Sequence, residues 1–220
     1  NRMGVFKWGY PMRPQETTIA EALKAAGYTT AHFGKWHLAN DMIPDSPPPS
    51  RYSFDEYGAF NCSGPQMYVH DDVKSAIPFI EKSHKADKPF FINLWIHEPH
   101  TPFHVDPKLQ KHFAKLREKD AIYAATLFHA DLRIGQLLDA LDRLNLTSNT
   151  LVIFSSDNGP ARGAPDAPLT LGYDSATGLG YGIAAAKGIT GGRKGYKAAL
   201  FEGGVGVPFI ARWPGKITAG

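Results

Sequence analysis

The sequence predicts an α/β fold in which a mixed, largely parallel sheet carries helices on both faces. Segments with helical periodicity alternate with strand-like segments along the chain, and an order of helix, glycine and strand is typical of layered α/β folds. In addition, residues 88–96 and 149–156 are continuous apolar runs, as expected for strands buried on both faces.

The first helix is predicted to begin at Thr17 or Thr18, because TTIAEALKAAG places a capping residue before apolar positions and Gly27 at the end. The next segment, YTTAHF, is rich in aromatic and β-branched residues and predicts a strand. Residues 40–70 are expected to be irregular, because three consecutive prolines exclude regular helix and central strand. A second helix is predicted over residues 71–84, with Pro78 kinking or splitting it.

Residues 88–96 predict the next strand. Residues 120–144 then predict a long helix with one buried stripe, formed by Leu127, Ala130, Ile134, Leu137, Leu141 and Leu144. Residues 149–156 are the clearest buried strand, and GVPFIARW near the end is another. Between these two strands, residues 159–196 form a glycine-rich loop whose length favours a functional or mobile segment.

Composition excludes several classes of function. The 220 residues are 43% hydrophobic and 20% charged, which suits a soluble globular protein with one large or two small domains. A net charge of only +3 argues against a nucleic-acid partner. No apolar run is long enough to span a membrane, and a single cysteine excludes an internal disulfide framework.

The segment DNGP directly follows the strand at residues 149–156. Ligands of open α/β sheets bind beyond the carboxyl ends of the strands, where Asp157 and Asn158 would lie. Adjacent oxygen donors suit a hard cation such as calcium or magnesium. The same tetrapeptide also suits a simple Asx-type turn, and both interpretations stay open at this point.

The segment HEPHTPFH follows the strand at residues 88–96. A zinc-protease interpretation fails, because His97 and His100 are three residues apart and Pro99 and Pro102 exclude a helix. Histidines on such a loop are better suited to hydrogen-bond donation or general acid catalysis. The competing interpretation, a histidine satisfied within a turn, applies above all to His97 and His104.

Basic residues flank two further strands. Lys35 and His37 come after YTTAHF, while Arg193, Lys194 and Lys197 precede the last strand. The latter three are either solvated loop charges or groups that reach a bound anion. Four strands would then present charged or metal-capable residues at one edge, forming a site for an anion and a hard cation from Lys35, His37, His100, Asp157, Asn158 and Lys197.

Four motifs in order resemble one family. GYTTAHFGKWHLA resembles the second signature of the type I sulfatases, G-Y-x-T-x-x-x-G-K-W-H-L, within the alkaline phosphatase superfamily. PFFINLWIHEPHTP resembles their strand and H-x-P-H-x-P loop, and VIFSSDNGP their metal-binding S-D-N-G segment. KAALFEGGVGVPFIARWPGKI resembles K-G-x-x-x-E-G-G-x-R-V-P-x-x-x-x-W-P-G. Arylsulfatases and N-acetylgalactosamine-sulfatase-like enzymes are the expected relatives.

The resemblance implies a sulfuric ester hydrolase, with a sulfated carbohydrate as the expected substrate. Lys35 and His37 would hold oxygens of the sulfate ester and of the nucleophile. His100 would contact the sulfate and help protonate the leaving alcohol. Lys197 would bridge to the sulfate, with Lys194 as the competing candidate.

The resemblance also implies calcium as the cofactor, rather than magnesium, with Asp157 and Asn158 as ligands. Family members carry a C-x-P-S-R or S-x-P-x-R motif whose first residue becomes a formylglycine nucleophile, and this chain contains neither motif. Residues 1–220 are therefore expected to be an internal part of the N-terminal catalytic domain, truncated at both ends and inactive alone. Family habit suggests a periplasmic, secreted or lysosomal location.

Two other functions stay open. A phosphodiesterase or phosphonate monoester hydrolase of the same superfamily would commonly have D-H-G, so Asn158 favours calcium and sulfate. A non-catalytic homologue that binds an anionic glycan would be expected to lose the charged positions, which this chain retains. The chain departs from the pattern at Phe33, where a smaller residue is usual, and at Gly206, where an arginine is common.

Overall fold

The computed structural model describes residues 11–38, 47–60, 67–174 and 177–220. These residues form two compact units. The first runs to His97 and includes Thr177, and the second comprises Glu98–Asp174 and Gly178–Gly220. The segment NRMGV and the single cysteine, Cys62, lie outside the described residues.

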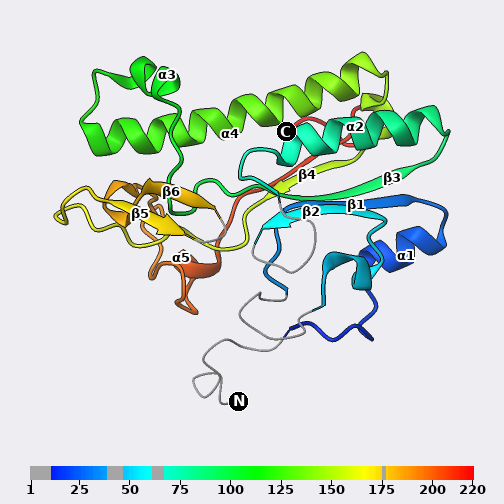
Figure 1. Ribbon diagram of the computed structural model, residues 1–220, viewed down its shortest axis with the longest axis horizontal. Coiled ribbons are helices and arrows are strands. Elements are labelled where there is room, and N and C mark those ends of the chain that lie inside the picture. Colours follow the sequence, from blue (N-terminus) through cyan, green and yellow to red (C-terminus); the bar gives the residue numbers. More distant parts are fainter. Residues whose placement is uncertain (1–10, 39–46, 61–66, 175–176) are drawn as a thin grey trace. The chain divides into compact units, whose positions relative to one another are not determined.

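The first unit is built on a parallel three-stranded sheet (Figure 1). Strand β1 (Thr29–Lys35) lies between β2 (Glu56–Phe60) and β3 (Phe90–Trp95). Parallel strands need crossover connections, and helix α2 (Asp72–Lys85) lies in the connection between β2 and β3. The parallel α/β class predicted from the sequence is confirmed in this unit.

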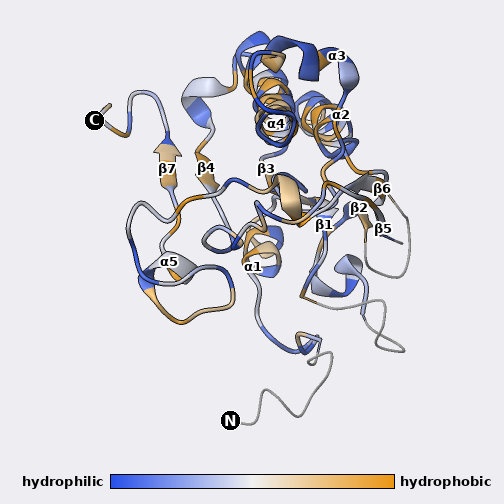
Figure 2. Cartoon of the chain, turned by 90° about the vertical axis from the view of Figure 1, so that its left-hand side faces the viewer, coloured by the Kyte–Doolittle hydropathy of each residue, from blue (hydrophilic) through white to orange (hydrophobic). Residues whose placement is uncertain are grey.

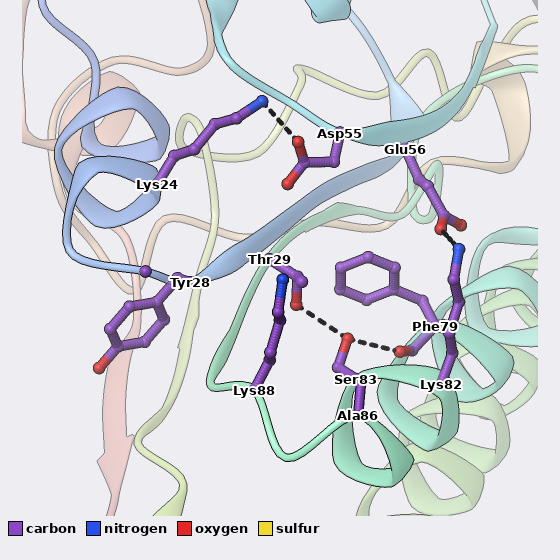
Figure 3. A pocket seen from close by; sticks show the side chains of 11 residues that line it. Lys24, Tyr28, Thr29, Asp55, Glu56, Phe79, Lys82, Ser83, Ala86 and Lys88 are labelled. Atoms are coloured by element: carbon purple, nitrogen blue, oxygen red, sulfur yellow. Dashed lines mark hydrogen bonds and ion pairs between the residues drawn. The ribbon is translucent and has the colours of Figure 1, made fainter.

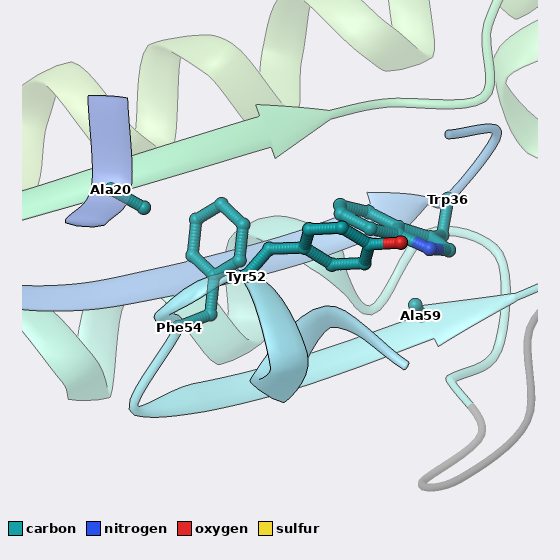
Figure 4. Packing of buried hydrophobic residues seen from close by; sticks show 5 residues of the cluster. All are labelled: Ala20, Trp36, Tyr52, Phe54 and Ala59. Carbon is teal, nitrogen blue, oxygen red and sulfur yellow. The ribbon is translucent and has the colours of Figure 1, made fainter. Parts of the chain in front are cut away.

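Helices α1 (Ile19–Ala25) and α2 (Asp72–Lys85) cover opposite faces of this sheet (Figure 1). Thr18 caps α1 by accepting a hydrogen bond from the amide of Glu21, as the sequence predicts. On the α1 face, Ala20 packs with a cluster of buried side chains (Figure 4) that also contains Trp36, Tyr52, Phe54 and Ala59.

On the other face, Phe33 meets Phe79 of α2 with their ring centroids 6.2 Å apart. This contact explains why a large residue stands at position 33. Helix α2 is continuous with Pro78 inside it, so the proline does not split it. The expected irregularity of residues 40–70 is wrong in part, since 49–52 form a 3-10 turn and β2 follows it.

The second unit contains the longest helix, α4 (Glu118–Arg143), and two antiparallel strand pairs. Strand β4 (Val152–Ser155) pairs with β7 (Phe209–Arg212), and β5 (Leu171–Asp174) pairs with β6 (Gly178–Tyr181). The remaining elements are short: α3 (Pro107–Gln110), α5 (Glu202–Val205) and 3-10 turns at Lys111–Phe113, Thr147–Asn149 and Ile183–Ala185.

Three expectations about this unit are wrong in detail. Residues 159–196 are not one loop, because they contain the β5–β6 hairpin. The strand at 149–156 exists but is not buried: β4 has one partner strand among the described residues, and Ile153 is 56% exposed. The strand predicted within GVPFIARW exists as β7 but is not buried either, since Phe209 is 68% exposed and Ile210 is 59% exposed. Apolar residues of β4 and β7 appear orange in Figure 2.

The predicted stripe on α4 is only partly correct. Ala130 and Leu141 are buried, but Leu127 is 42% exposed. The buried face instead runs through small residues and includes a charged side chain, Arg133. No described helix is both long and apolar enough to cross a membrane.

Candidate active site

The carboxyl end of β1 presents Lys35 and His37 around a buried tryptophan. Trp36 has no exposed surface and lies in the aromatic cluster, with its ring 6.2 Å from that of Trp95 and stacked against it. Neighbouring side chains of an extended segment point to opposite sides. Burial of Trp36 therefore turns its two neighbours away from the core, and Lys35 is half-buried while His37 is exposed.

A sharp bend precedes these residues. Gly34 has a φ of +105°, and a Cβ at this position would lie 2.0 Å from the carbonyl oxygen of Trp95 in β3. Only glycine combines this backbone conformation with such a close approach. The glycine of the G-K-W-H signature thus has a structural role, since it sets the direction in which Lys35 leaves the sheet.

His32, which the sequence reasoning did not single out, is a fully buried histidine beneath this bend. Its Nε2 lies 3.0 Å from the carbonyl oxygen of Lys35, and its Nδ1 lies 3.2 Å from the side-chain amide nitrogen of Asn93. Burial lowers the pKa of His32 to about 4, against the opposing effect of hydrogen bonds with the backbone at Lys35 and Gly34. His32 is therefore neutral near pH 7.

In the second unit, Asp157 and Asn158 follow β4 as predicted. The Asp157 carboxylate is exposed, and no described residue pairs with it. The Asn158 side-chain nitrogen donates to the carbonyl oxygen of Gly159 at 2.8 Å, which leaves its oxygen as an acceptor. Two oxygen donors on adjacent residues fit a hard cation such as calcium.

The DNGP turn packs directly on the segment that carries the candidate lysines. The amide of Gly159 donates to the carbonyl oxygen of Gly204 at 2.9 Å, and a Cβ on Gly159 would lie 2.1 Å from the carbonyl oxygen of Gly203. The amide of Lys197 donates to the carbonyl oxygen of Pro160 at 2.9 Å. The backbone at Lys197 is therefore tied to the turn that holds the two candidate ligands.

The two competing lysines differ in their surroundings. The Lys194 ammonium lies 4.1 Å from the centroid of the Phe201 ring, in a cation–π contact. The Lys197 ammonium is exposed and has no partner among the described residues. Lys197 is therefore the better of the two candidates for contact with an anion.

The three histidines of the HEPHTPFH segment lie in different environments. His97 is buried, 5.8 Å from the Phe60 ring between centroids, and His104 bonds through Nδ1 to the carbonyl oxygen of Leu179. His100 is exposed, and its Nδ1 lies 2.6 Å from the carbonyl oxygen of Thr101. A carbonyl only accepts, so Nδ1 carries a hydrogen.

Comparison with known families identifies the group to which these motifs belong. The family model described as Sulfatase matches residues 5–219, almost the whole chain. The chain belongs to the sulfatase family. The identification that the four ordered motifs predicted is confirmed.

Two curated sulfatases illustrate the similarity. The chain is 32% identical over 202 residues to an ulvan-active sulfatase of Formosa agariphila, and 27% identical over 247 residues to the N-acetylgalactosamine-6-sulfatase of Canis lupus familiaris. These matches cover 74% and 94% of the chain. The chain spans only 39% and 41% of the two relatives.

A solved structure shares the fold of this sulfatase-family chain. The crystal structure of Ps i-CgsB in complex with k-i-k-neocarrahexaose matches with a TM-score of 0.74 at 23% identity. The match covers 97% of the chain and 51% of that protein. At this level of identity the match supports the fold alone.

At Gly206, where the sulfatase pattern commonly has an arginine, the side chain of another arginine lies nearby. An ideal Cβ on Gly206 would lie 3.4 Å from the Cδ of Arg193. The Arg193 side chain thus runs beside the position where the family pattern has an arginine.

The sulfatase site residues divide between the two units. Lys35 and His37 belong to the first unit, and the other candidates, His100, Asp157, Asn158, Lys194 and Lys197, belong to the second. Within the second unit, backbone hydrogen bonds hold the segment of Lys197 against the turn of Asp157 and Asn158. The assignment of these residues to catalysis and metal binding stays a prediction.

A separate hollow of about 440 Å³ lies where the strands of the first sheet begin, at the edge opposite Lys35 (Figure 3). Lys24 pairs with Asp55 at 2.5 Å, and Lys82 pairs with Glu56. Acidic partners therefore already neutralise two of its lysines, and Lys88 alone keeps an unpaired charge among the lysines that line it. This hollow is less suited to an anion than the opposite edge.

Proposed function

We propose that the full-length protein is a sulfuric ester hydrolase that removes sulfate from a carbohydrate. One observation carries the proposal: in a chain of the sulfatase family, the exposed Lys197 lies on a segment tied by backbone hydrogen bonds to the turn of Asp157 and Asn158. This arrangement supports a site in which Lys197 would meet the sulfate oxygens near oxygen ligands for a metal ion.

The chemistry of sulfate-ester cleavage matches these residue types. Negative charge develops on the departing oxygen and persists on the sulfate oxygens, so lysines at fixed positions lower the barrier. Lys35 and Lys197 would bind the sulfate oxygens, and His37 would hold the nucleophile. His100 would give its Nε2 proton to the leaving alcohol, while its Nδ1 is oriented by the carbonyl of Thr101.

Divalent-metal binding is general in this family, and we propose calcium for this protein. Asp157 offers an exposed carboxylate and Asn158 an amide oxygen, which are ligand types that calcium favours. Calcium prefers six to eight oxygen ligands, so further ligands must come from other residues and from substrate. When bound, the ion would supply positive charge beside the sulfate group.

The expected substrate is a sulfated polysaccharide or oligosaccharide. The ulvan-active and N-acetylgalactosamine-6-sulfatase relatives carry names that refer to carbohydrates. The nucleophile would be a formylglycine, as the family resemblance implies. The 220 residues contain no motif for it, and the activity is therefore proposed for the full-length protein.

The test is to express the full-length natural protein with a formylglycine-generating enzyme and to measure release of inorganic sulfate. Sulfated galactosaminides, ulvan oligosaccharides and a small aryl sulfate would serve as substrates, with matched phosphate diesters as controls. Sulfate release in the presence of calcium is expected. Hydrolysis of phosphate diesters without sulfate release would favour the phosphodiesterase alternative, and saccharide binding without turnover would favour a non-catalytic homologue.

A further inference from the structure

His32 occupies an environment that is unusual for a strand residue. Three aromatic rings surround its imidazole, with centroids at 4.9 Å for Trp36, 5.5 Å for Phe54 and 5.4 Å for Trp95. The side chain is fully buried. Burial of a polar ring is costly unless its nitrogens form hydrogen bonds. Both ring nitrogens of His32 form one.

The two hydrogen bonds define the form of the ring. The Asn93 side-chain nitrogen is a donor, so Nδ1 must accept. The carbonyl oxygen of Lys35 accepts only, so Nε2 must carry the hydrogen and donate. His32 is therefore a neutral imidazole with a single allowed tautomer, which Asn93 selects.

The bond from His32 spans the bend at Gly34. It joins the side chain of residue 32 to the backbone of residue 35, so it closes a short ring that includes Gly34, whose φ is positive. Beyond it, the Trp36 amide donates to the carbonyl oxygen of Phe60 at 3.3 Å. At 3.0 Å, the His32 bond is a shorter polar contact, made to the carbonyl group of Lys35 itself.

We propose that His32, held in one tautomer by Asn93, is a positioning residue that fixes the direction in which Lys35 and His37 leave the sheet. The proposal rests on the proposed function, because it assigns His32 a role in presenting two sulfate-binding side chains. His32 does not itself reach the substrate. It acts through the Lys35 carbonyl.

The test compares three variants of the full-length protein. His32→Phe keeps an aromatic ring in the aromatic surroundings but removes the donor. His32→Gln restores a donor, because its amide nitrogen is as many bonds from the backbone as Nε2. His84→Phe is the matched control, since His84 is an exposed residue of α2.

His32→Phe should lower kcat/KM for sulfate release about tenfold to a hundredfold, as a displaced binding group does, with a folded protein by circular dichroism. His32→Gln should recover most of the loss, and His84→Phe should match the wild type. A purely structural role of His32 would instead make the Phe and Gln variants equally defective. That result, or wild-type kcat/KM in His32→Phe, would overturn the proposal.

Hydrogen exchange supplies a readout that does not depend on turnover. In His32→Phe, the amides of residues 35–37 should exchange faster, while those of α2 remain unchanged. Unchanged exchange at residues 35–37 would overturn the positioning role. If the wild-type protein released no sulfate, the proposed function would fail, and the exchange measurement would still decide whether His32 fixes this segment.

Discussion

The guanidinium of Arg133 on α4 lies 2.5 Å from the carboxylate of Glu98, the first residue of the second unit and the second residue of the HEPHTPFH segment. Their side chains are only 6% and 1% exposed. A buried charge is tolerated where a partner of opposite charge neutralises it. This ion pair therefore ties the loop that carries His100 to the longest helix.

Removing one member of this pair should destabilise the second unit strongly. Arg133→Met is expected to lower the free energy of unfolding by about 3–5 kcal/mol, because it leaves the Glu98 carboxylate buried without its cation. Arg117→Met breaks an exposed ion pair with Asp120, in which the Arg117 side chain is 83% exposed. This variant should lose less than about 1 kcal/mol of the free energy of unfolding. Urea denaturation of both variants measures the difference, and equal losses would show that burial of the pair is unimportant.

The buried imidazole of His32 should make stability depend on pH. The pKa of His32 is lowered to about 4 in the folded protein, below its ordinary value of 6.5, so the unfolded chain takes up the proton first as the pH falls. The stability from this residue is full above pH 6.5 and is lost as the pH falls towards 4, with a slope of at most about 1.4 kcal/mol per pH unit.

His32→Phe should remove that part of the pH dependence. The groups around the ring are Trp36, Phe54, Trp95, Asn93 and backbone carbonyls, and no charged side chain among the described residues contacts it. Thermal unfolding of the wild type and the variant between pH 4 and pH 8 measures the effect. Parallel curves for the two proteins would contradict the assignment of a neutral, buried imidazole.

The two lysines before β7 should contribute unequally to catalysis. Lys197→Ala is expected to lower kcat/KM for sulfate release by about a hundredfold or more, because its ammonium is available to the sulfate. Lys194→Ala should have a small effect, because that ammonium lies over the Phe201 ring. A larger loss for Lys194→Ala than for Lys197→Ala would reverse this assignment.

The turn after β4 should bind calcium through Asp157. Asp157→Ala is expected to weaken calcium binding to the full-length protein by at least about tenfold, since a charged ligand contributes strongly to affinity. Asp166→Ala, which changes another exposed aspartate of the same unit, is the control and should bind as the wild type does. Isothermal titration with calcium measures both, and equal affinities would exclude Asp157 as a ligand.

The close approach of Gly159 to Gly203 should tolerate no side chain. In Gly159→Ala, the new methyl would lie 2.1 Å from the carbonyl oxygen of Gly203, so the turn and the lysine segment must separate. We expect a loss of about 2–3 kcal/mol in stability, together with weaker calcium binding. Gly172→Ala in β5, where a Cβ meets no atom within 4 Å, should change neither property.

Much of the fold could be predicted because its signals are local. The cap at Thr18, the strand at β1 and the long helix α4 follow from short patterns of residue type. Burial was harder to predict, since it depends on partners far away in the sequence. Strand β4 has an apolar sequence, and yet most of its residues are exposed in the part of the chain that the structure describes. Strand β2 was not predicted, because Glu56 and Gly58 are residue types that are uncommon in strands.

The candidate site was predicted from motifs, and the residues outside those motifs were not found. The alternation of the strand does not distinguish His32 from an ordinary strand residue. The one sequence signal is its position, two residues before the G-K-W-H of the signature. Arg133 is a charged residue on the buried face of α4, so a search for apolar residues at helical spacing does not find it. Both residues matter through partners, Lys35 and Glu98, that only the folded chain brings to them.

The most direct test is the rate of sulfate release by the full-length protein, measured for the wild type and for Lys35→Ala in the presence of calcium. We predict that the wild type releases inorganic sulfate from a sulfated saccharide, and that Lys35→Ala lowers kcat/KM by about a hundredfold or more. Undiminished turnover in Lys35→Ala would contradict the claim that the end of β1 binds the sulfate group.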